Sequence, residues 1–388
     1  MKKILIFRTH LLPYSETFIL AQASNLEHWS ATLLGEIQLC KGLPLDGLTV
    51  ETLLESEAAH AALSMQRALN DYVQTSLLSR ADGYKDVGFS LIHAHFAIDG
   101  LRVYPLAKKM NVPLIITLHG YDINIYKEWW HNGSGGRSMA SYPERLIALA
   151  KEENIHFLAV SEAIKNRAIE YGLPEEKLKV SYIGVDCEQF KPSDIAMSER
   201  RQVLFIGRLV EKKGCQYLLA AFCKIQEKFR NIKLVVAGSG PQEAMLKNFA
   251  IEHKIRVEFL GALGREEIQQ ELSKSRVLCL PSITAENGDA EGLPIVVLEA
   301  QSCGVPVITS ARGGATEGIV NGVTGYSHKE KDIDEISMLL DRVLADHELS
   351  EKLGTNAREH ILKNMNSKNC MQRLESIYDQ TYYASCID

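Results

Sequence analysis

Nine short apolar runs constrain the fold of this 388-residue chain more than any other feature. The runs are rich in Val, Ile and Leu and show no regular alternation of apolar and polar residues. They lie at 4–7, 90–96, 113–120, 156–161, 202–208, 233–240, 257–261, 277–282 and 306–310. Strands that are buried on both faces have this pattern, which is typical of parallel sheets.

Segments with helical periodicity lie between these runs. Apolar residues recur at helical spacing in 217–229 and in 243–254, and the tail from 366 has the same character. Strands that alternate with helices indicate an α/β architecture. The length favours two domains. We expect an N-terminal domain over 1–190, a C-terminal domain over 191–365 and a final helix over 366–388, with the polar segment 187–200 as the linker.

Composition excludes several classes of protein. The formal net charge is −6, whereas a nucleic-acid-binding protein usually has a basic face. The apolar stretch of the N-terminus, MKKILIF, is too short for a signal peptide, and no later segment is apolar enough to span a bilayer. The eight cysteines form no Cys-x-x-Cys pair and fit a reducing compartment. We expect a cytoplasmic protein, and peripheral contact with the inner face of the membrane is an open alternative.

One aromatic pair bears on that alternative. Trp129 and Trp130 lie beside a Gly/Ser loop, in YKEWWHNGSGGRS. Such a pair could stack on sugar rings or touch a membrane interface, or it could be a buried part of the loop.

Polar residues and glycines follow the predicted strands repeatedly. Ligands of open parallel sheets bind at the carboxyl ends of the strands, so these residues are candidates for a site. The candidates include Arg8, His93, His95, His119, Gly207, Arg208, Gly238 and Gly240.

Two glycine-containing turns suit a nucleotide. GRLVEKKG combines Gly207 with Arg208 and Lys213, whose cations suit a diphosphate. Two solvated cations on a turn would give the same pattern. AGSGP, with Gly238 and Gly240, follows a strand, where backbone N–H groups could meet a nucleotide.

The segment GDAEGLPIVVLEAQSCGVPVITSARGG (288–314) carries the most specific pattern. Gly292-Leu293-Pro294 is predicted to start a helix with Pro294 in its first turn, where free N–H groups and the helix dipole favour a phosphate. Glu299, further along this helix, can accept hydrogen bonds from ribose hydroxyls. Glu291 can bind the hydroxyls of a hexose. Two surface glutamates flanking a core helix would be the structural alternative.

Together with GVPVITSARGGATEGIVNGVTGY, these motifs resemble the retaining glycosyltransferases of the GT-B fold, the large family 4 group. Weaker matches are TLHGYD, AVSEA and SYIGVDCEQFKP. The resemblance implies two Rossmann-like domains with parallel sheets facing a cleft. The N-terminal domain would bind the acceptor and the C-terminal domain the donor, and the last helix would cross back to the N-terminal domain.

The resemblance also implies residue roles. Arg208 and Lys213 would stabilise the diphosphate, Glu299 would hold the ribose, Glu291 would contact the donor sugar, and His119 would lie beside it. The full donor-binding set is Gly207, Gly238, Gly240, Gly292, Leu293, Pro294 and Glu299. Gly313, Gly314 and Glu317 would shape the domain wall.

The first loop departs from the family. HLLPYSETF (10–18) stands where the family usually has a glycine pair. Ser15 and Glu16 are candidates for acceptor contact, although Ser15 could equally cap the next helix. Further candidates on the acceptor side are His93, His95 and Asp122. A zinc site at His93 and His95 lacks a matching carboxylate cluster. The resemblance implies catalysis without a divalent ion, because Arg and Lys neutralise the diphosphate, and the loop ITAENGDAEG contains a single Asp and therefore no DxD. We expect no metal and no cofactor.

We therefore expect a retaining hexosyltransferase that uses a UDP- or GDP-sugar and a saccharide or lipid-linked oligosaccharide acceptor, in bacterial surface polysaccharide synthesis. Front-face transfer is our mechanistic hypothesis, because no carboxylate identifies itself as a nucleophile. A sugar-nucleotide epimerase of the same fold and a non-catalytic partner subunit are the alternatives. A dinucleotide-dependent oxidoreductase lacks its GxGxxG after the first strand.

Overall fold

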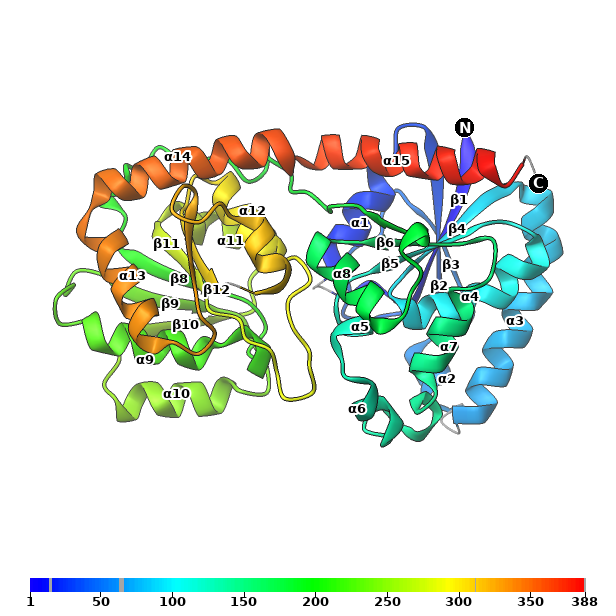
Figure 1. The fold of residues 1–388 in the computed structure, drawn as a ribbon, viewed down its shortest axis with the longest axis horizontal. Helices are drawn as coiled ribbons and strands as arrows, with labels where there is room; N and C mark the ends of the chain where they lie inside the picture. Colours follow the sequence, from blue (N-terminus) through cyan, green and yellow to red (C-terminus); the bar gives the residue numbers. More distant parts are fainter. Residues whose placement is uncertain (14–15, 63–65, 311, 387–388) are drawn as a thin grey trace. The chain divides into compact units, whose positions relative to one another are not determined.

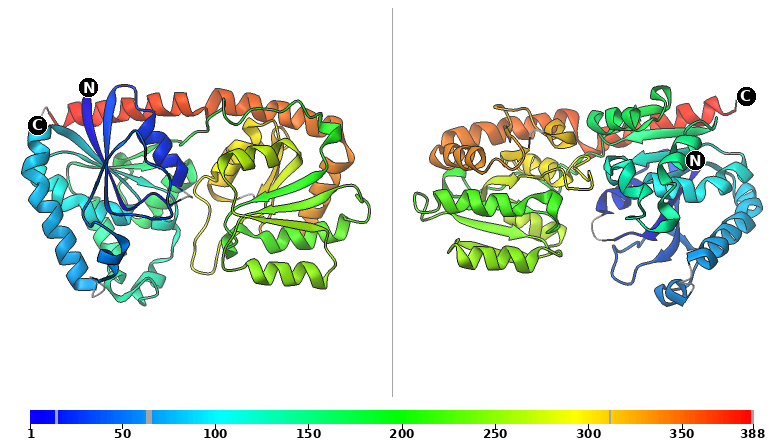
Figure 2. Two further views of the ribbon diagram at one scale, coloured as in Figure 1. Left: turned by 180° about the vertical axis from the view of Figure 1, so that it is seen from behind. Right: turned by 60° about the horizontal axis from the view of Figure 1, so that its bottom comes forward.

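The computed structural model describes residues 1–13, 16–62, 66–310 and 312–386. The chain forms two compact units. The first comprises Met1–Val160, Ile164–Ser181 and Met371–Asp388, and the second comprises Ser161–Ala163 and Tyr182–Cys370. Each unit has its own parallel sheet with helices on both faces (Figures 1 and 2). The predicted α/β class with two parallel sheets is confirmed.

The first unit has a seven-stranded sheet in the order β3-β2-β1-β4-β5-β6-β7. Its strands are β1 (Lys2–Leu11), β2 (Trp29–Gln38), β3 (Thr49–Thr52), β4 (Phe89–His95), β5 (Leu114–Leu118), β6 (Ile155–Ala159) and β7 (Leu178–Val180). The strand order reverses between β1 and β4. A parallel sheet opens a crevice at such a point, outside the carboxyl ends of the two strands.

The second unit has a six-stranded sheet in the order β10-β9-β8-β11-β12-β13. Its strands are β8 (Gln202–Ile206), β9 (Lys233–Ala237), β10 (Val257–Gly261), β11 (Ser275–Leu280), β12 (Val307–Ser310) and β13 (Gly325–His328). Here the order reverses between β8 and β11. The residues that follow these two strands are therefore the ones to inspect for a ligand site.

Fifteen α-helices are assigned in the described ranges. They are α1 (Thr17–Ser24), α2 (Glu57–Ala62), α3 (Gln66–Val87), α4 (Ala97–Met110), α5 (Tyr121–Asn124), α6 (Lys127–His131), α7 (Tyr142–Leu149), α8 (Glu162–Tyr171), α9 (Cys215–Ile225), α10 (Glu243–Glu252), α11 (Arg265–Ser273), α12 (Ile295–Ser302), α13 (Ile333–Ala345), α14 (His347–Asn364) and α15 (Ser367–Ala384). The predicted helices at 217–229, 243–254 and the tail correspond to α9, α10 and α15.

All nine apolar runs form strands, and four further strands were not predicted. β2 interrupts its apolar residues with Ser30, Gly35 and Glu36, and β3 is the polar sequence TVET. β7 has three residues, and β13 is the short polar sequence GYSH. These strands form because a neighbouring strand offers backbone partners, which a pattern of apolar residues does not reveal.

Helix α15 is anchored on the first unit by its polar residues as well as by its apolar face. The Tyr378 ring packs edge-on against Trp29, with centroids 5.6 Å apart. Glu375 accepts the backbone N–H groups of His28 and Trp29, and Asp379 accepts the indole N–H of Trp29 at 3.0 Å. The start of β2 is thereby fixed to the end of the chain.

The polar segment 187–200, predicted as a linker, groups with the second unit. It contains one 3₁₀ turn, Met197–Glu199, and the fully buried Phe190. The Phe190 carbonyl accepts hydrogen bonds from Ser302 and Arg358. The segment is therefore packed onto the unit that follows it.

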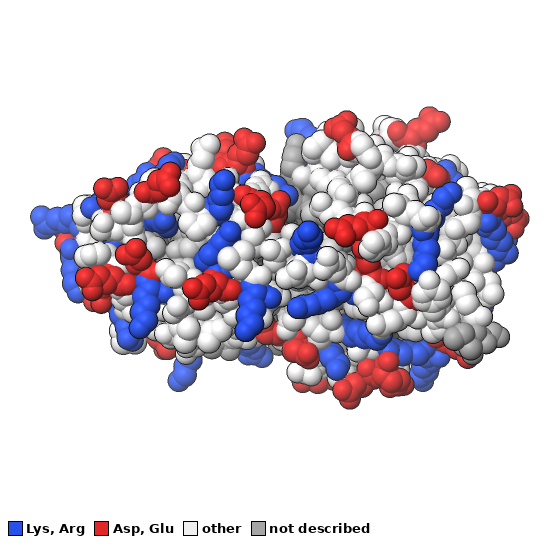
Figure 3. All heavy atoms as spheres, turned by 90° about the horizontal axis from the view of Figure 1, so that it is seen from above, with Lys and Arg blue, Asp and Glu red and all other residues white. Residues whose placement is uncertain are grey.

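Two surface properties bear on partners. On the face drawn in Figure 3, basic and acidic side chains are interspersed. Over the described residues, no helix is both long enough and apolar enough to cross a membrane.

Candidate functional site

Arg208 stands at the point where the strand order of the second sheet reverses. It follows β8 directly after Gly207, and its side chain is exposed. Among the described residues it forms no ion pair and no hydrogen bond through its side chain. A guanidinium in this position is available for an anionic ligand.

Glycines allow the turns at this edge to approach each other closely. A Cβ on Gly238 would overlap the carbonyl oxygen of Gly207, and one on Gly240 would crowd the carbonyl of Leu209. Gly238 also has φ +146°, which side chains rarely adopt. The two predicted glycine turns are thus in backbone contact with each other.

Lys213 and Glu291 form an ion pair at the same edge. Lys213 Nζ lies 2.7 Å from Glu291 Oε1, and Ser282 donates its hydroxyl to the same oxygen at 3.0 Å. Burial alone would raise the pKa of Glu291, but the charges of Lys213 and Lys212 and these hydrogen bonds lower it below its ordinary value. Glu291 is therefore held ionised.

Two further contacts hold the loop between β11 and α12. Lys212 pairs with Asp289 at 2.9 Å, and Glu330 accepts both the backbone N–H and the hydroxyl of Thr284 at 2.9 Å. The sequence analysis missed these partners because Lys212 and Asp289 are 77 residues apart. The polar composition of the loop was the available signal.

Helix α12 begins one residue later than predicted. Pro294 is the residue before the helix, with φ −73° and ψ 107°, and Ile295 is the first helical residue. Pro294 is followed by a 3₁₀-type bond from Val297 N–H to its carbonyl. Extended backbone at Pro294 keeps the preceding loop out of the helical turn.

Free amides mark the start of α12. Within the described part of the chain, no hydrogen bond is donated by four backbone N–H groups, those of Gly292, Leu293, Ile295 and Val296. The first N–H groups of any helix lack internal partners and carry a partial positive charge. This arrangement can bind a phosphate or the oxygens of a sugar.

Glu299 differs from Glu291 in its surroundings. Its side chain is only 8% exposed, and no hydrogen bond to its carboxylate is present among the described residues. Burial raises the pKa of Glu299 to about 7, and the charge of Arg265 offsets part of this rise. A buried carboxylate with unused acceptor capacity is suited to the hydroxyls of a ligand.

The glycine pair 313–314 packs closely against the loop between β11 and α12. A Cβ on Gly314 would overlap the carbonyl oxygen of Gly292, and Ser161 donates its hydroxyl to that carbonyl at 2.8 Å. Glu317 accepts the backbone N–H groups of Glu162 and Ala163 at 2.8 and 2.7 Å. All of these residues group with the second unit. Glu317 therefore has a structural role, because its carboxylate binds backbone N–H groups.

The first unit has its own polar cluster at the carboxyl ends of β1 and β4. Arg8 forms two hydrogen bonds with Glu16, at 2.9 and 2.6 Å, and one with Asp99 at 2.6 Å. Asp99 also accepts the backbone N–H and hydroxyl of Thr9. Glu16, an acceptor-side candidate, is thus occupied by Arg8, and the candidate Ser15 lies outside the described residues.

Asp122 holds the turn that carries His119. Its buried carboxylate accepts backbone N–H groups of His119, Gly120 and Ala97 at 3.1, 2.9 and 3.1 Å. Burial raises the pKa of Asp122 to about 6, although these hydrogen bonds act in the opposite direction. The contacts give Asp122 a positioning role, and its contact with an acceptor stays a prediction.

Three histidines gather behind this turn. His93 is fully buried and bonds Tyr378 and Thr117, each at 2.7 Å. His95 Nδ1 lies 3.1 Å from His119 Nε2. His119 is the only partly exposed member of the three. Among the described residues, no group of three or more His, Cys, Asp or Glu side chains could hold a metal ion.

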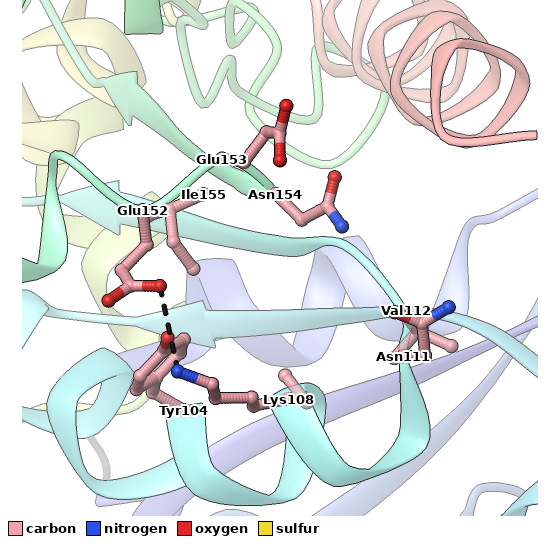
Figure 4. A pocket seen from close by; sticks show the side chains of 9 residues that line it. Tyr104, Lys108, Asn111, Val112, Glu152, Glu153, Asn154 and Ile155 are labelled. Atoms are coloured by element: carbon pink, nitrogen blue, oxygen red, sulfur yellow. Dashed lines mark ion pairs between the residues drawn. The ribbon is translucent and has the colours of Figure 1, made fainter. Parts of the chain in front are cut away.

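Two other features lie away from these residues. Figure 4 shows a hollow lined by Tyr104, Lys108, Glu152 and their neighbours. It lies where β5 and β6 begin, so it is at the amino ends of the strands. The polar cluster around Arg8 lies at their carboxyl ends. Trp130 is buried against Tyr142, whereas Trp129 is half-buried, so one half of the aromatic pair belongs to the core.

Comparisons with known proteins agree with this geometry. The model of Glycosyltransferase Family 4 matches residues 60–189, and the model of Glycosyl transferases group 1 matches residues 188–360. An uncharacterised glycosyltransferase of Methanocaldococcus jannaschii is 27% identical over 308 residues, 75% of each chain. A colanic acid biosynthesis glycosyltransferase of Salmonella typhimurium, named as putative, is 28% identical over 73% of this chain and 69% of its own.

Solved structures show the same fold. Anabaena HepE in complex with UDP and glucose has a TM-score of 0.79 at 19% identity, covering 98% of this chain and 100% of its own. The fold and the motifs at the strand ends define a glycosyltransferase of the GT-B class. The two family models together match residues 60–360 and support a glycosyltransferase of the GT-B group 1 type.

Proposed function

We propose that this glycosyltransferase moves a hexose from a UDP- or GDP-sugar to a saccharide or lipid-linked oligosaccharide acceptor, with retention of configuration and without a divalent ion. The second unit binds the donor and the first unit binds the acceptor. Relatives named for colanic acid and amylovoran biosynthesis support an acceptor from bacterial surface polysaccharide synthesis. The UDP-glucose complex of Anabaena HepE and a GDP-mannose-dependent relative of Corynebacterium glutamicum support the two donor classes.

One observation carries the proposal. At the carboxyl edge of the second sheet, groups with unused hydrogen-bonding capacity gather: the exposed Arg208, the free amides at 292–296 and the buried Glu299. Cations and amides suit a diphosphate, and a carboxyl group with free acceptor oxygens suits ribose hydroxyls. A nucleoside diphosphate requires both kinds of group.

The chemistry follows from the charges. In the proposed front-face step, the bond between the anomeric carbon and the diphosphate oxygen breaks on the same face on which the acceptor oxygen bonds. The proton of the acceptor hydroxyl passes to the leaving diphosphate, whose charge Arg208 and Lys213 stabilise. Glu291 is unsuited to act as the nucleophile, because Lys213 and Ser282 already bind its carboxylate. His119 contacts the transferred sugar.

A thermal-shift panel with UDP, GDP, ADP and their sugar conjugates, in EDTA, tests the donor site. A ligand at 100 times its dissociation constant stabilises by about 2.7 kcal/mol. We expect one base to raise the melting temperature and Glu299→Ala to abolish the rise. Absence of a shift with every nucleotide would contradict the donor site.

Product analysis separates transfer from the alternatives. A transferase releases nucleoside diphosphate faster when acceptor is added, whereas an epimerase converts the donor without releasing it. A non-catalytic subunit does neither. Acceptor-dependent release by the full chain is the expected result.

A further inference from the structure

We propose that His95 is a positioning residue that makes His119 present a protonated Nδ1 to the substrate. The proposal rests on the proposed function, because it assumes that His119 contacts the transferred sugar. It deepens that function by assigning a role to a fully buried residue that does not itself reach the sugar.

The His119 ring is held on several sides. The rings of Phe18 and Phe96 lie 4.8 and 4.5 Å from it, centroid to centroid, and His95 Nδ1 lies 3.1 Å from its Nε2. Its backbone is fixed by Asp122. Within the described part of the chain, His119 Nδ1 is neither buried nor hydrogen-bonded, so it is the nitrogen available to a ligand.

A single hydrogen bond joins His95 Nδ1 and His119 Nε2, so only one of these two nitrogens carries a proton. Burial, together with neighbouring charges that include Arg8, lowers the pKa of both His95 and His119 well below the ordinary value, so both imidazoles are neutral. A neutral imidazole has one N–H and one bare nitrogen. The contact therefore allows two arrangements: either His95 Nδ1–H donates to His119 Nε2, or His119 Nε2–H donates to His95 Nδ1.

The far nitrogen of His95 distinguishes the two arrangements. His95 Nε2 is buried and has no hydrogen-bond partner among the described residues. If His119 were the donor, His95 would carry its proton on this nitrogen, leaving a buried N–H unsatisfied. Among backbone groups, buried N–H groups without partners are rarer than under-satisfied carbonyl acceptors, and we apply the same preference to the imidazole. The geometry therefore favours His95 as the donor, which places the proton of His119 on Nδ1.

This arrangement has a consequence for substrate recognition. A protonated Nδ1 can only donate, so His119 would bind an oxygen lone pair of the sugar rather than accept a hydroxyl proton. A fixed donor needs no change of tautomer when the substrate binds, and such preorganisation favours the reaction.

Histidine-selective ¹⁵N NMR of the full chain tests the proposal without any substrate. The Nδ1 and Nε2 shifts of a neutral imidazole identify which nitrogen carries the proton, and His119→Asn assigns the signals by their loss. We expect the Nδ1–H tautomer for His119. The Nε2–H tautomer in the wild-type protein would overturn the proposal, whatever the enzyme's activity.

Two similarly sized variants test the role in turnover. His95→Asn can keep an N–H donor close to the Nδ1 position, whereas His95→Leu cannot. We expect His95→Leu to lose roughly tenfold or more in kcat, the ratio that one hydrogen bond of ordinary strength supplies, and His95→Asn to recover most of it. Wild-type kcat in a folded His95→Leu variant would contradict the positioning role.

Matched controls separate this result from a loss of fold or of donor binding. His93→Leu removes an equally buried imidazole that bonds Tyr378 and Thr117 rather than His119, so it should lower stability and leave the His119 tautomer unchanged. The affinity for nucleoside diphosphate should be the same in both His95 variants. If the wild-type protein bound no nucleotide, the proposed function would fail while the NMR result still decided the tautomer.

Discussion

The carboxyl edges of the two sheets contrast in how their polar groups are satisfied. In the first unit, Arg8, Asp99 and Asp122 are bound by other protein groups. In the second unit, the side chains of Arg208 and Glu299 have no hydrogen-bond partner among the described residues. Polar groups that are satisfied internally hold a shape, and those that are not are available to a ligand. The contrast separates positioning residues from ligand-binding residues, except that Lys213, which pairs with Glu291, is proposed to serve in both roles.

Lys213→Ala tests the second edge and has the largest expected effect. We expect kcat to fall by roughly 10²–10³, the usual loss for one preorganised donor. Lys212→Ala is the matched control. It breaks the 2.9 Å pair with Asp289 and should cost less than about tenfold, because this pair holds the loop. Transfer at the wild-type rate by Lys213→Ala would contradict the claim that the second unit stabilises the leaving diphosphate.

Asp122→Ala tests the positioning residues at the carboxyl ends of the strands in the first unit. Three backbone N–H groups lose their acceptor, so we expect the free energy of unfolding to fall by about 2–4 kcal/mol. Asp122→Asn keeps one acceptor oxygen and should lose less. Urea denaturation measures both. The affinity for nucleoside diphosphate should not change, and a large change would mean that Asp122 also serves the donor.

Glu299→Gln should stabilise the protein above neutral pH. The folded-state pKa of about 7 lies above the ordinary value of 4.5, so the folded state binds this proton more tightly than the unfolded state does. The contribution of Glu299 to stability is therefore lost as the pH rises from about 4.5 to about 7.

Because Gln does not ionise, the variant should be more stable than wild type by about 1–3 kcal/mol at pH 8 and nearly equal to it at pH 5. Thermal melts at the two pH values measure this difference. A variant less stable than wild type at pH 8 would show that the carboxylate has a partner in the folded state.

Glu291→Gln should lower the free energy of unfolding, whereas Glu299→Gln should raise it. The effect of Glu291→Gln should also be the smallest of the four. The pKa of Glu291 is lowered, so its stabilising contribution is present at neutral pH and is lost as the pH falls through the folded-state value. We expect a loss of about 0.5–1.5 kcal/mol at pH 7, because Gln can still bind Lys213 and Ser282. An equal loss at a pH below the folded-state pKa of Glu291 would show that its charge is not the cause.

The sequence predicted the parts of the fold that depend on local patterns. Buried apolar runs predicted nine strands. Turns rich in glycine and charged residues predicted the candidate site at the carboxyl ends of the strands in the second unit. The sequence did not predict that Asp122 binds the backbone N–H of Ala97, 25 residues away, or that Lys213 pairs with Glu291, 78 residues away. Such pairings depend on strand order, which brings distant residues together and leaves no local pattern.

The most direct test of the account is calorimetric titration of the full chain, in EDTA, with the nucleoside diphosphate that the thermal-shift panel selects. We predict binding to the wild-type protein and at least tenfold weaker binding to Arg208→Ala, since a hydrogen bond to a charged group contributes about 1.5–3 kcal/mol. Equal affinity in the two proteins, or binding that requires a divalent ion, would contradict the claim that the unpaired groups of the second unit form the donor site.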